Sequence, residues 1–165
     1  MRHLILALCA LTAVSCGGGE SGSGDGSGSG GDTVVLEIAG NDNMMFDKKS
    51  MSVKAGSTVT IKFTNAGSQP IETMGHNFIL LTAGVTALDF GAAVAAPESG
   101  ATVENGYVPT EETLKSQMIV STGLIGPGES VEVTFSAPTE VGGYEYVCTF
   151  PGHYAMMRGV LTVTP

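Results

Sequence analysis

The sequence predicts an all-β domain, a Greek-key β-sandwich or barrel, with a short helical excursion between two of its strands. Three observations support this fold class. Apolar and polar residues alternate along several short runs, the runs are rich in Val, Thr, Phe and Tyr, and Gly, Pro, Asn and Asp separate them. Such runs are typical of half-buried antiparallel strands, and about five or six of them at this spacing favour a sandwich or barrel.

The alternation predicts the strands in chain order. In the run 57–65, Val59, Ile61 and Phe63 fall on one face, which a strand would turn toward the core. The run 76–81 is apolar almost throughout and indicates a central strand. The alternating runs are 33–40, 57–65, 129–137, 143–150 and 158–165.

Residues 82–118 break the strand pattern and predict the helical excursion. The run 85–96 is rich in Ala and Leu, which favour a helix, although Gly91 weakens it by about 1 kcal/mol. The run 110–118 begins with Thr110 as a candidate N-cap, followed by two acidic residues and a later Lys. This order of charges suits the helix dipole, so two short helices are expected between strands.

Composition narrows the class of protein. The chain has 165 residues, with 16 Asp+Glu against 7 Lys+Arg and a formal net charge of −9. Hydrophobic residues make up 42% of it, which argues against intrinsic disorder for most of the chain. No cluster of Lys or Arg is available to neutralise phosphates, so nucleic acid is not an expected partner.

The N-terminal residues 1–15 are predicted to be a signal peptide. Arg2 and His3 supply a short positive region, and the apolar run 4–14 is too short for a membrane span of about 20 residues. The stretch TAVSC, followed by GGG, resembles the bacterial lipobox, which implies that Cys16 is lipidated. The alternative is an ordinary signal peptide cut nearby, which leaves Cys16 as a free thiol.

The segment 16–31 is predicted to be this lipidated cysteine followed by a flexible linker. Residues 17–31 contain 9 Gly and 4 Ser and no apolar side chain that could offset the entropy of ordering. The folded domain is therefore expected at 32–165. An anchor at Cys16 predicts a place in the bacterial periplasm or at the cell surface, with the lipid as the only attachment to the membrane.

The folded domain has a small inventory of metal-binding side chains. It holds two histidines, His76 and His153, and one cysteine, Cys148. Two imidazoles and one thiolate, with a weak axial Met, are the ligands of a mononuclear blue-copper site. Cys148, His153 and Met157 lie on one short run, in which Pro-Gly at 151–152 provides a turn. Gly75 lacks a side chain, so its carbonyl oxygen is a candidate axial ligand opposite Met157.

Each of these residues also has an ordinary structural explanation. A lone Cys on a strand is most often a small buried hydrophobe, a lone His a hydrogen-bonded structural residue, and a Met core filler. Because the entire His and Cys inventory of the domain falls at predicted strand ends, the metal site is favoured over three separate structural roles.

Four stretches resemble the azurin/auracyanin type of cupredoxin, a family of bacterial blue-copper proteins. They are GNDNMMF at 40–46, MGHNF at 74–78, GLIGPGES at 123–130 and CTFPGHYAMMRGVLTV at 148–163, within a similarity that runs over nearly all of 33–164. The resemblance implies the cupredoxin fold and one type 1 copper that cycles between Cu(I) and Cu(II). It implies His76, Cys148 and His153 as ligands, with Met157 and the Gly75 carbonyl axial.

The resemblance also assigns roles to residues around the ligands. It implies that backbone N–H groups of Asn77 and Phe150 donate to the Cys148 sulfur. It implies that the side chains of Asn77 and Thr149 link the two ligand loops. The cysteines of the disulfide usual in azurins are missing from this domain, and this difference leaves the copper ligands intact.

The function implied by the resemblance is electron transfer, with no enzymatic activity. Electrons would enter through the edge of His153, and an exposed apolar patch around it would dock partners such as cytochromes or membrane oxidoreductases. The net negative charge favours partners with positive docking faces, and a monomer is expected. The patch residues are Met44, Met74, Phe150, Pro151, Ala155 and Met156.

Three other functions fit parts of this pattern. A copper-dependent enzyme would need further His ligands for a second copper, and the domain has none to spare. A copper-storage or copper-delivery protein would use Met-rich runs, and the methionine pairs at 44–45 and 156–157 are compatible with such a role. A structural zinc module is the third, because the same side chains bind Zn²⁺.

Overall fold

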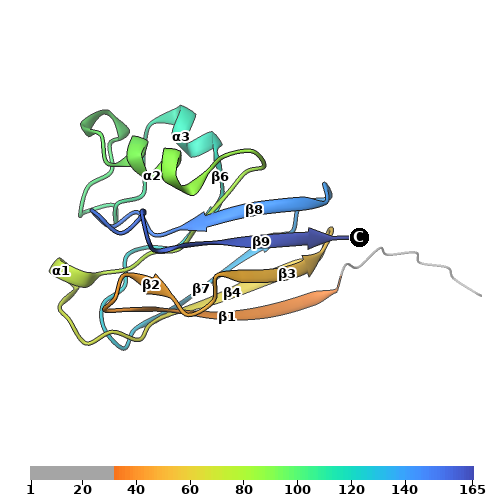
Figure 1. Cartoon of the computed structure of the whole chain (residues 1–165), viewed down its shortest axis with the longest axis horizontal. Helices are drawn as coiled ribbons and strands as arrows, with labels where there is room; N and C mark the ends of the chain where they lie inside the picture. The colour runs from red at the N-terminus through yellow and green to blue at the C-terminus, as the bar shows by residue number, and fades with distance from the viewer. Residues whose placement is uncertain (1–31) are drawn as a thin grey trace, which may run out of the picture.

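The computed structural model describes residues 32–165, which form a sandwich of two β-sheets (Figure 1). The predicted all-β sandwich is confirmed. The predictions on the signal peptide, on Cys16 and on the linker lie outside the described residues. Within 32–165 the longest helix has eight residues, and no helix has the length and apolar character to cross a membrane.

The first sheet has four strands in the order β2-β1-β4-β7. Strand β1 runs parallel to β4, from Thr33 beside Thr58 to Gly40 beside Asn65, and β4 pairs antiparallel with β7. The bounds are β1 Thr33–Asn41, β2 Met45–Phe46, β4 Thr58–Asn65 and β7 Ser130–Ser136.

The second sheet has five strands in the order β3-β9-β8-β5-β6. Strand β3 runs parallel to β9, and the other neighbours pair antiparallel. The bounds are β3 Ser50–Lys54, β5 Ile79–Leu81, β6 Met118–Ser121, β8 Gly142–Val147 and β9 Arg158–Thr164.

The expectation of antiparallel strands alone is wrong for the pairs β1–β4 and β3–β9. Alternation along one strand reports which face is buried and carries no information on the direction of its neighbour, so the pattern could not separate the two cases. The short strands β2, β3 and β6 were not predicted, although Met51 and Val53 of β3 are buried in alternation. The predicted strand 76–81 is shortened to β5, because residues 76–78 serve the loop that leads into it.

The core between the sheets follows the period of two. In β4, Val59, Ile61 and Phe63 are buried, while the residues between them are half-buried. Rings from both sheets meet in the centre of the core: Phe46 packs edge-on against Phe63 and Tyr146, with centroids 5.9 and 5.4 Å apart. This aromatic layer lies next to the end of β8, and it gives the residues that follow β8 a rigid base.

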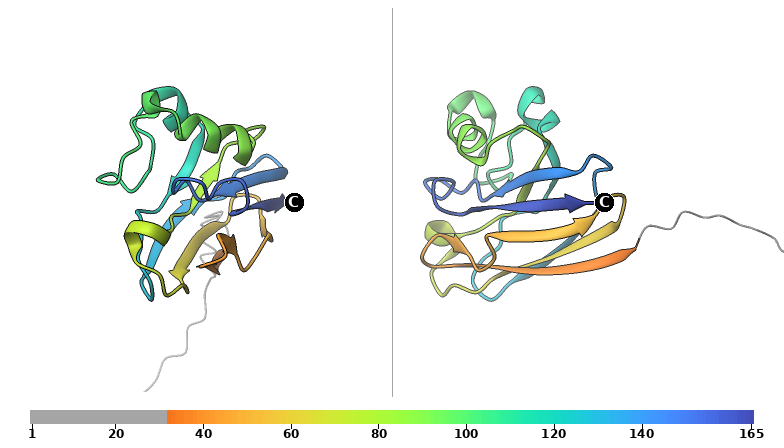
Figure 2. Two further views of the ribbon diagram at one scale, coloured as in Figure 1. Left: turned by 60° about the vertical axis from the view of Figure 1, so that its left-hand side comes forward. Right: turned by 45° about the vertical axis from the view of Figure 1, so that its right-hand side comes forward.

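The predicted helical excursion between two strands is confirmed. It lies between β5 and β6, the second of which was not predicted, and covers the outer face of the five-stranded sheet (Figure 2). Helix α2 (Ala87–Val94) begins at Thr86, whose hydroxyl accepts from the Asp89 N–H. A 3₁₀ turn at Pro97–Ser99 and helix α3 (Glu112–Ser116) follow. The N-cap of α3 is Glu111 and not the predicted Thr110, because the Glu111 carboxylate accepts from two backbone N–H groups of the first turn.

Candidate metal centre

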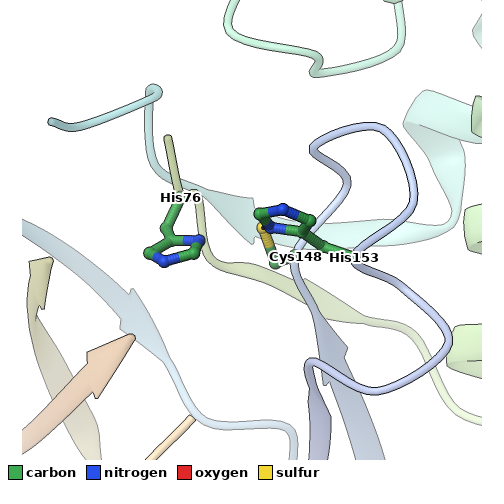
Figure 3. Close-up of side chains that lie close together, drawn as sticks. All are labelled: His76, Cys148 and His153. Carbon is green, nitrogen blue, oxygen red and sulfur yellow. Dashed lines mark hydrogen bonds between the residues drawn. The ribbon is translucent and has the colours of Figure 1, made fainter. Parts of the chain in front are cut away.

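The three predicted equatorial ligands converge at one end of the sandwich (Figure 3). The ligand atoms of His76, Cys148 and His153 lie within 4.8 Å of one another, and all three side chains are buried. The Cys148 Sγ lies 3.7 Å from the His153 Nδ1, and the two imidazole centroids lie 5.1 Å apart. No other group of three or more His, Cys, Asp or Glu with this spacing occurs in residues 32–165.

His76 reaches the site from a short segment between helix α1 (Ile71–Met74) and β5. Its backbone N–H donates to the Ile125 carbonyl (3.1 Å), and its carbonyl accepts from the Ile125 N–H (2.9 Å). Asn65 supports this segment from β4, because its amide donates to the carbonyls of Ile125 (3.1 Å) and Met74 (3.3 Å). Helix α1 was not predicted from the sequence.

The single hydrogen bond of the His76 ring defines its tautomer. Its Nε2 lies 3.1 Å from the Asn41 carbonyl oxygen, which can only accept, so Nε2 carries the proton. The Nδ1 is buried and has no hydrogen-bond partner within residues 32–165. An unpaired lone pair in a buried site is costly, and a metal ion at this position would satisfy it.

Cys148 follows β8 directly and is fully buried. Burial raises the pKa of its thiol to about 12, although backbone N–H groups of Asn77 and Phe150 that point at the sulfur act in the opposite direction. The metal-free side chain is therefore a neutral thiol at neutral pH. Binding a metal would release its proton and place the thiolate under those two donors.

Both imidazoles are neutral near pH 7. Burial, with a smaller contribution from His76, lowers the pKa of His153 to about 4. Burial also lowers the pKa of His76. Two neutral imidazoles and a thiol that ionises on metal binding match the donor set of a type 1 copper site, so the residues fit the predicted copper.

The loop between β8 and β9 holds the other ligands in a closed turn. The His153 N–H donates to the Phe150 carbonyl (2.9 Å), and the Met157 N–H donates to the His153 carbonyl (2.8 Å). The Cys148 N–H donates to the Met157 carbonyl (3.0 Å), which closes the loop at its base. Gly152 has a φ of 82°, a left-handed conformation that glycine adopts at no steric cost.

The structure separates the two adjacent methionines of this loop. Met157 is fully buried, whereas Met156 is 52% exposed. A Cβ atom at Gly40 would lie 2.5 Å from the Met157 Cε and 2.9 Å from the His76 Cδ2, so both side chains press against the Gly40 backbone. Met157 and His76 thus border the same buried space. The axial role of Met157 stays a prediction.

Gly75, the other predicted axial position, is buried immediately before His76. Its N–H donates to the Ile71 carbonyl (2.9 Å), and a Cβ here would lie 2.6 Å from that oxygen. The absence of a side chain is therefore required by the turn itself. The role of the Gly75 carbonyl toward the metal stays a prediction.

Asn77 and Thr149 connect the two ligand segments, in the arrangement that the resemblance implies. The Asn77 amide donates to the Thr149 Oγ1 (2.8 Å), and the Thr149 N–H donates to the Asn77 Oδ1 (2.8 Å). The same pair also ties down a third segment, because Asn77 donates to the Gly106 carbonyl (2.9 Å) and Thr149 to the Tyr107 carbonyl (2.7 Å). All four bonds are short and buried or part-buried, so they restrain the ligands against each other.

The predicted docking patch is unevenly exposed. Pro151, Ala155 and Met156 are exposed, whereas Met44 and Met74 are half-buried. Phe150 is buried, with its ring centroid 4.6 Å from that of His153 and 5.2 Å from that of Tyr107. Phe150 therefore packs under the ligand loop and adds little to its surface.

Sequence reasoning missed several residues that support the centre. They are Gly40, Asn41 and Asn65, and the segment 106–107. Asn41 and residues 106–107 act through backbone carbonyls, which a side-chain pattern does not reveal. Gly40 carried a signal, because a glycine at the end of a strand often marks a close approach of two segments.

Comparison with known proteins agrees with the fold and the centre. The profile of copper binding proteins of the plastocyanin/azurin family matches residues 32–164. Auracyanin-A of Chloroflexus aurantiacus is 40% identical over 168 residues, which cover 99% of this chain and 97% of that protein. Azurin of Pseudomonas denitrificans is 37% identical over 131 residues, covering 78% and 96% of the two chains.

The solved structure of auracyanin A, described as a "blue" copper protein from Chloroflexus aurantiacus, superposes with a TM-score of 0.66 and 38% identity. The match covers 80% of this chain and 99% of that one.

Proposed function

The chain belongs to the plastocyanin/azurin family of copper-binding proteins, and we propose that it carries single electrons between redox proteins outside the cytoplasm. Its cofactor is copper, and His76, Cys148 and His153 form the type 1 centre. The observation that carries the proposal is the buried His76 Nδ1. Among the described residues it has no hydrogen-bond partner, and it lies beside a buried thiol and a neutral imidazole.

Copper bound here supplies reversible one-electron exchange between Cu(I) and Cu(II). The protein contributes a rigid and dry set of donors. The bonds from Asn77 and Thr149 resist rearrangement of the ligand segments, and the N–H groups of Asn77 and Phe150 stabilise negative charge on the Cys148 sulfur. Enclosed ligands of this kind suit an electron carrier better than an enzyme, which needs an open position for substrate.

The edge of His153 is the proposed route for the electron. His153 lies in the β8–β9 loop, whose residues Pro151, Ala155 and Met156 are exposed. A small apolar surface of this kind suits transient docking of a cytochrome or a membrane oxidoreductase to a monomer.

A copper-storage role is less well supported by the methionine pairs. Met156 is exposed and Met157 is enclosed, so their thioethers do not face one ion. The ligand set would also be an unusual choice for rapid release of copper, because the thiolate and both imidazoles are buried.

The experiment that tests the proposal is a visible absorption spectrum of the protein after addition of Cu(II) and then ascorbate. An intense blue band that bleaches on reduction and returns on oxidation is expected, because it arises from a copper–thiolate bond and one-electron cycling. A pale protein that still binds metal would favour storage or zinc binding instead.

We further propose that a lipid on Cys16 anchors the protein to a membrane, with residues 17–31 as a tether. The lipobox-like TAVSC and the linker directly behind it support this proposal. Mass spectrometry of the natively expressed N-terminus is expected to show a diacylglyceryl group on Cys16. An unmodified peptide that begins elsewhere would contradict it.

A further inference from the structure

An apolar hollow of about 430 Å³ lies between helix α1 and the loop that carries residues 103–106. Ile71, Val103 and Leu124 supply its apolar lining, and Glu72 and Glu104 stand beside them. We call it the Leu124 hollow. Val103 is 55% exposed, one of the few large apolar side chains in residues 32–165 that face solvent to this extent. Ile71 and Leu124 are half-buried. A concave surface lined by apolar side chains that reach solvent is typical of interaction sites.

The Leu124 hollow is connected to the metal centre through single residues. A Cβ atom at Gly75 would lie 3.0 Å from the Leu124 side chain, and the next residue, Ile125, pairs with His76. Gly106 also lines the hollow, and its carbonyl accepts from Asn77. A molecule seated in the hollow would thus be separated from the ligand His76 by one layer of residues.

The two acidic residues of the Leu124 hollow have no cationic partner. Glu72 and Glu104 are exposed, and neither forms an ion pair within residues 32–165. Lys49 and Arg158 form no ion pair there either, and both line a different hollow together with Glu145 and the exposed Met156. Those cations lie at the starts of β3 and β9, whereas Leu124 follows β6, at the opposite edge of the five-stranded sheet.

We propose that the Leu124 hollow docks a redox protein through an apolar face that carries a lysine or arginine. The cation would lie beside Glu72 and Glu104, and its alkyl stem would cover Val103 and Leu124. The proposal rests on the proposed electron-transfer function and extends the docking surface at the exposed loop residues to the Leu124 hollow, because residues 106–107 adjoin that loop at Thr149 and Phe150. The net charge of −9 attracts a cationic partner from a distance.

The first test measures electron transfer from hexaammineruthenium(II), a small cationic reductant, to the oxidised copper-loaded protein. Each Ru(II) gives one electron and becomes Ru(III), and the protein is reduced by one electron. The variant Glu72→Gln/Glu104→Gln is expected to lower the second-order rate about fivefold to tenfold at low ionic strength, and the difference should vanish at high salt. The matched control Glu132→Gln/Glu140→Gln removes the same charge away from the hollow and should change the rate less than about twofold.

Equal effects of the two double variants would overturn the proposal, because net charge alone would then explain the rates. Failure of the proposed function itself would look different: the blue band would fail to form, or fail to bleach with ascorbate, in the unaltered protein as well.

The second test locates the docking face without any electron transfer. Amide NMR spectra of the reduced, copper(I)-loaded protein are recorded during titration with a reduced, basic c-type cytochrome. Shifts are expected at residues 71–72, 103–106 and 123–124 as well as in the loop 151–156, and those at the hollow should disappear in the Glu72→Gln/Glu104→Gln variant. Shifts confined to the loop, centred on Lys49 and Arg158, or spread over the whole surface would contradict the proposal.

Discussion

The two parts of the metal centre are held in different ways. Cys148, His153 and Met157 come from one closed loop, whose backbone hydrogen bonds join residues within nine positions of each other. His76 stands on a short segment that is held by Asn41, Asn65 and Ile125, residues far apart in the sequence. The loop is therefore a local structure, whereas the position of His76 depends on the assembly of the whole sandwich.

This difference implies that the loop supplies most of the ligands as one unit, whereas the rest of the fold positions His76 against them. Changes in the loop should alter the metal centre with little effect on folding, and changes around His76 should affect stability and the metal centre together. The following predictions separate the two cases.

The largest effect is expected from Cys148→Ser. Loss of the thiolate should abolish the blue band entirely, while the domain stays folded because serine fits the same space. The band is read by visible absorption, and folding by far-ultraviolet circular dichroism. A blue spectrum retained in this variant would refute the ligand assignment.

Asn77→Ala should cost stability, because it removes one end of the link between the segments. It leaves the Thr149 N–H and the Gly106 carbonyl without their partner, which should lower the free energy of unfolding by about 2–4 kcal/mol. Denaturant unfolding of the metal-free protein measures the change.

Asn105→Ala is the matched control for Asn77→Ala. Asn105 also accepts from one backbone N–H and donates to one carbonyl, but these bonds are exposed or part-buried. Its loss should cost about 1 kcal/mol or less. Equal costs for the two variants would mean that the buried link has no special role.

Acid should destabilise the metal-free protein. The pKa of His153 is lowered to about 4 in the folded state, from 6.5, and that of His76 is also lowered. Between these values the unfolded chain binds more protons than the folded one, so the free energy of unfolding falls as the pH drops from about 6.5 toward 4. Denaturant melts at a series of pH values measure this slope, and a flat profile in that range would contradict buried neutral imidazoles.

The smallest effect separates the two methionines. Met157→Leu should keep the blue colour and raise the reduction potential, because a buried thioether beside His76 is replaced by a hydrocarbon. Met156→Leu should leave the potential nearly unchanged, since Met156 is exposed. Cyclic voltammetry compares the two, and a larger shift in Met156→Leu would show that the loop register is wrong.

The same contrast explains what the sequence could predict. The loop ligands were readable because Cys148, His153 and Met157 fall within ten residues around a Pro-Gly turn. Four of the five alternating strands were predicted within one residue of their observed bounds, and the fifth, 143–150, ends three residues earlier, at Val147. The fold class followed from the same pattern, since strict period two along β4 requires a buried face.

The supports of His76 could not be predicted from that pattern. Asn41 acts through a carbonyl, helix α1 has only four residues, and the parallel pairing of β1 with β4 is a property of two strands together. The N-cap of α3 is Glu111, whereas Thr110 was predicted. Both side chains are able to accept from the first-turn N–H groups, and only the conformation of the surrounding loop decides between them. Such features arise from tertiary contacts and leave little trace in local sequence.

One claim underlies the proposed metal centre: His76, Cys148 and His153 hold a single copper ion together. Extended X-ray absorption fine structure at the copper edge, recorded on the copper-loaded protein, tests it most directly. We predict a first shell of one short copper–sulfur bond and two imidazole nitrogens. A shell of nitrogen and oxygen donors without sulfur would contradict the claim, and a shell with sulfur and a single imidazole would remove His76 from the site.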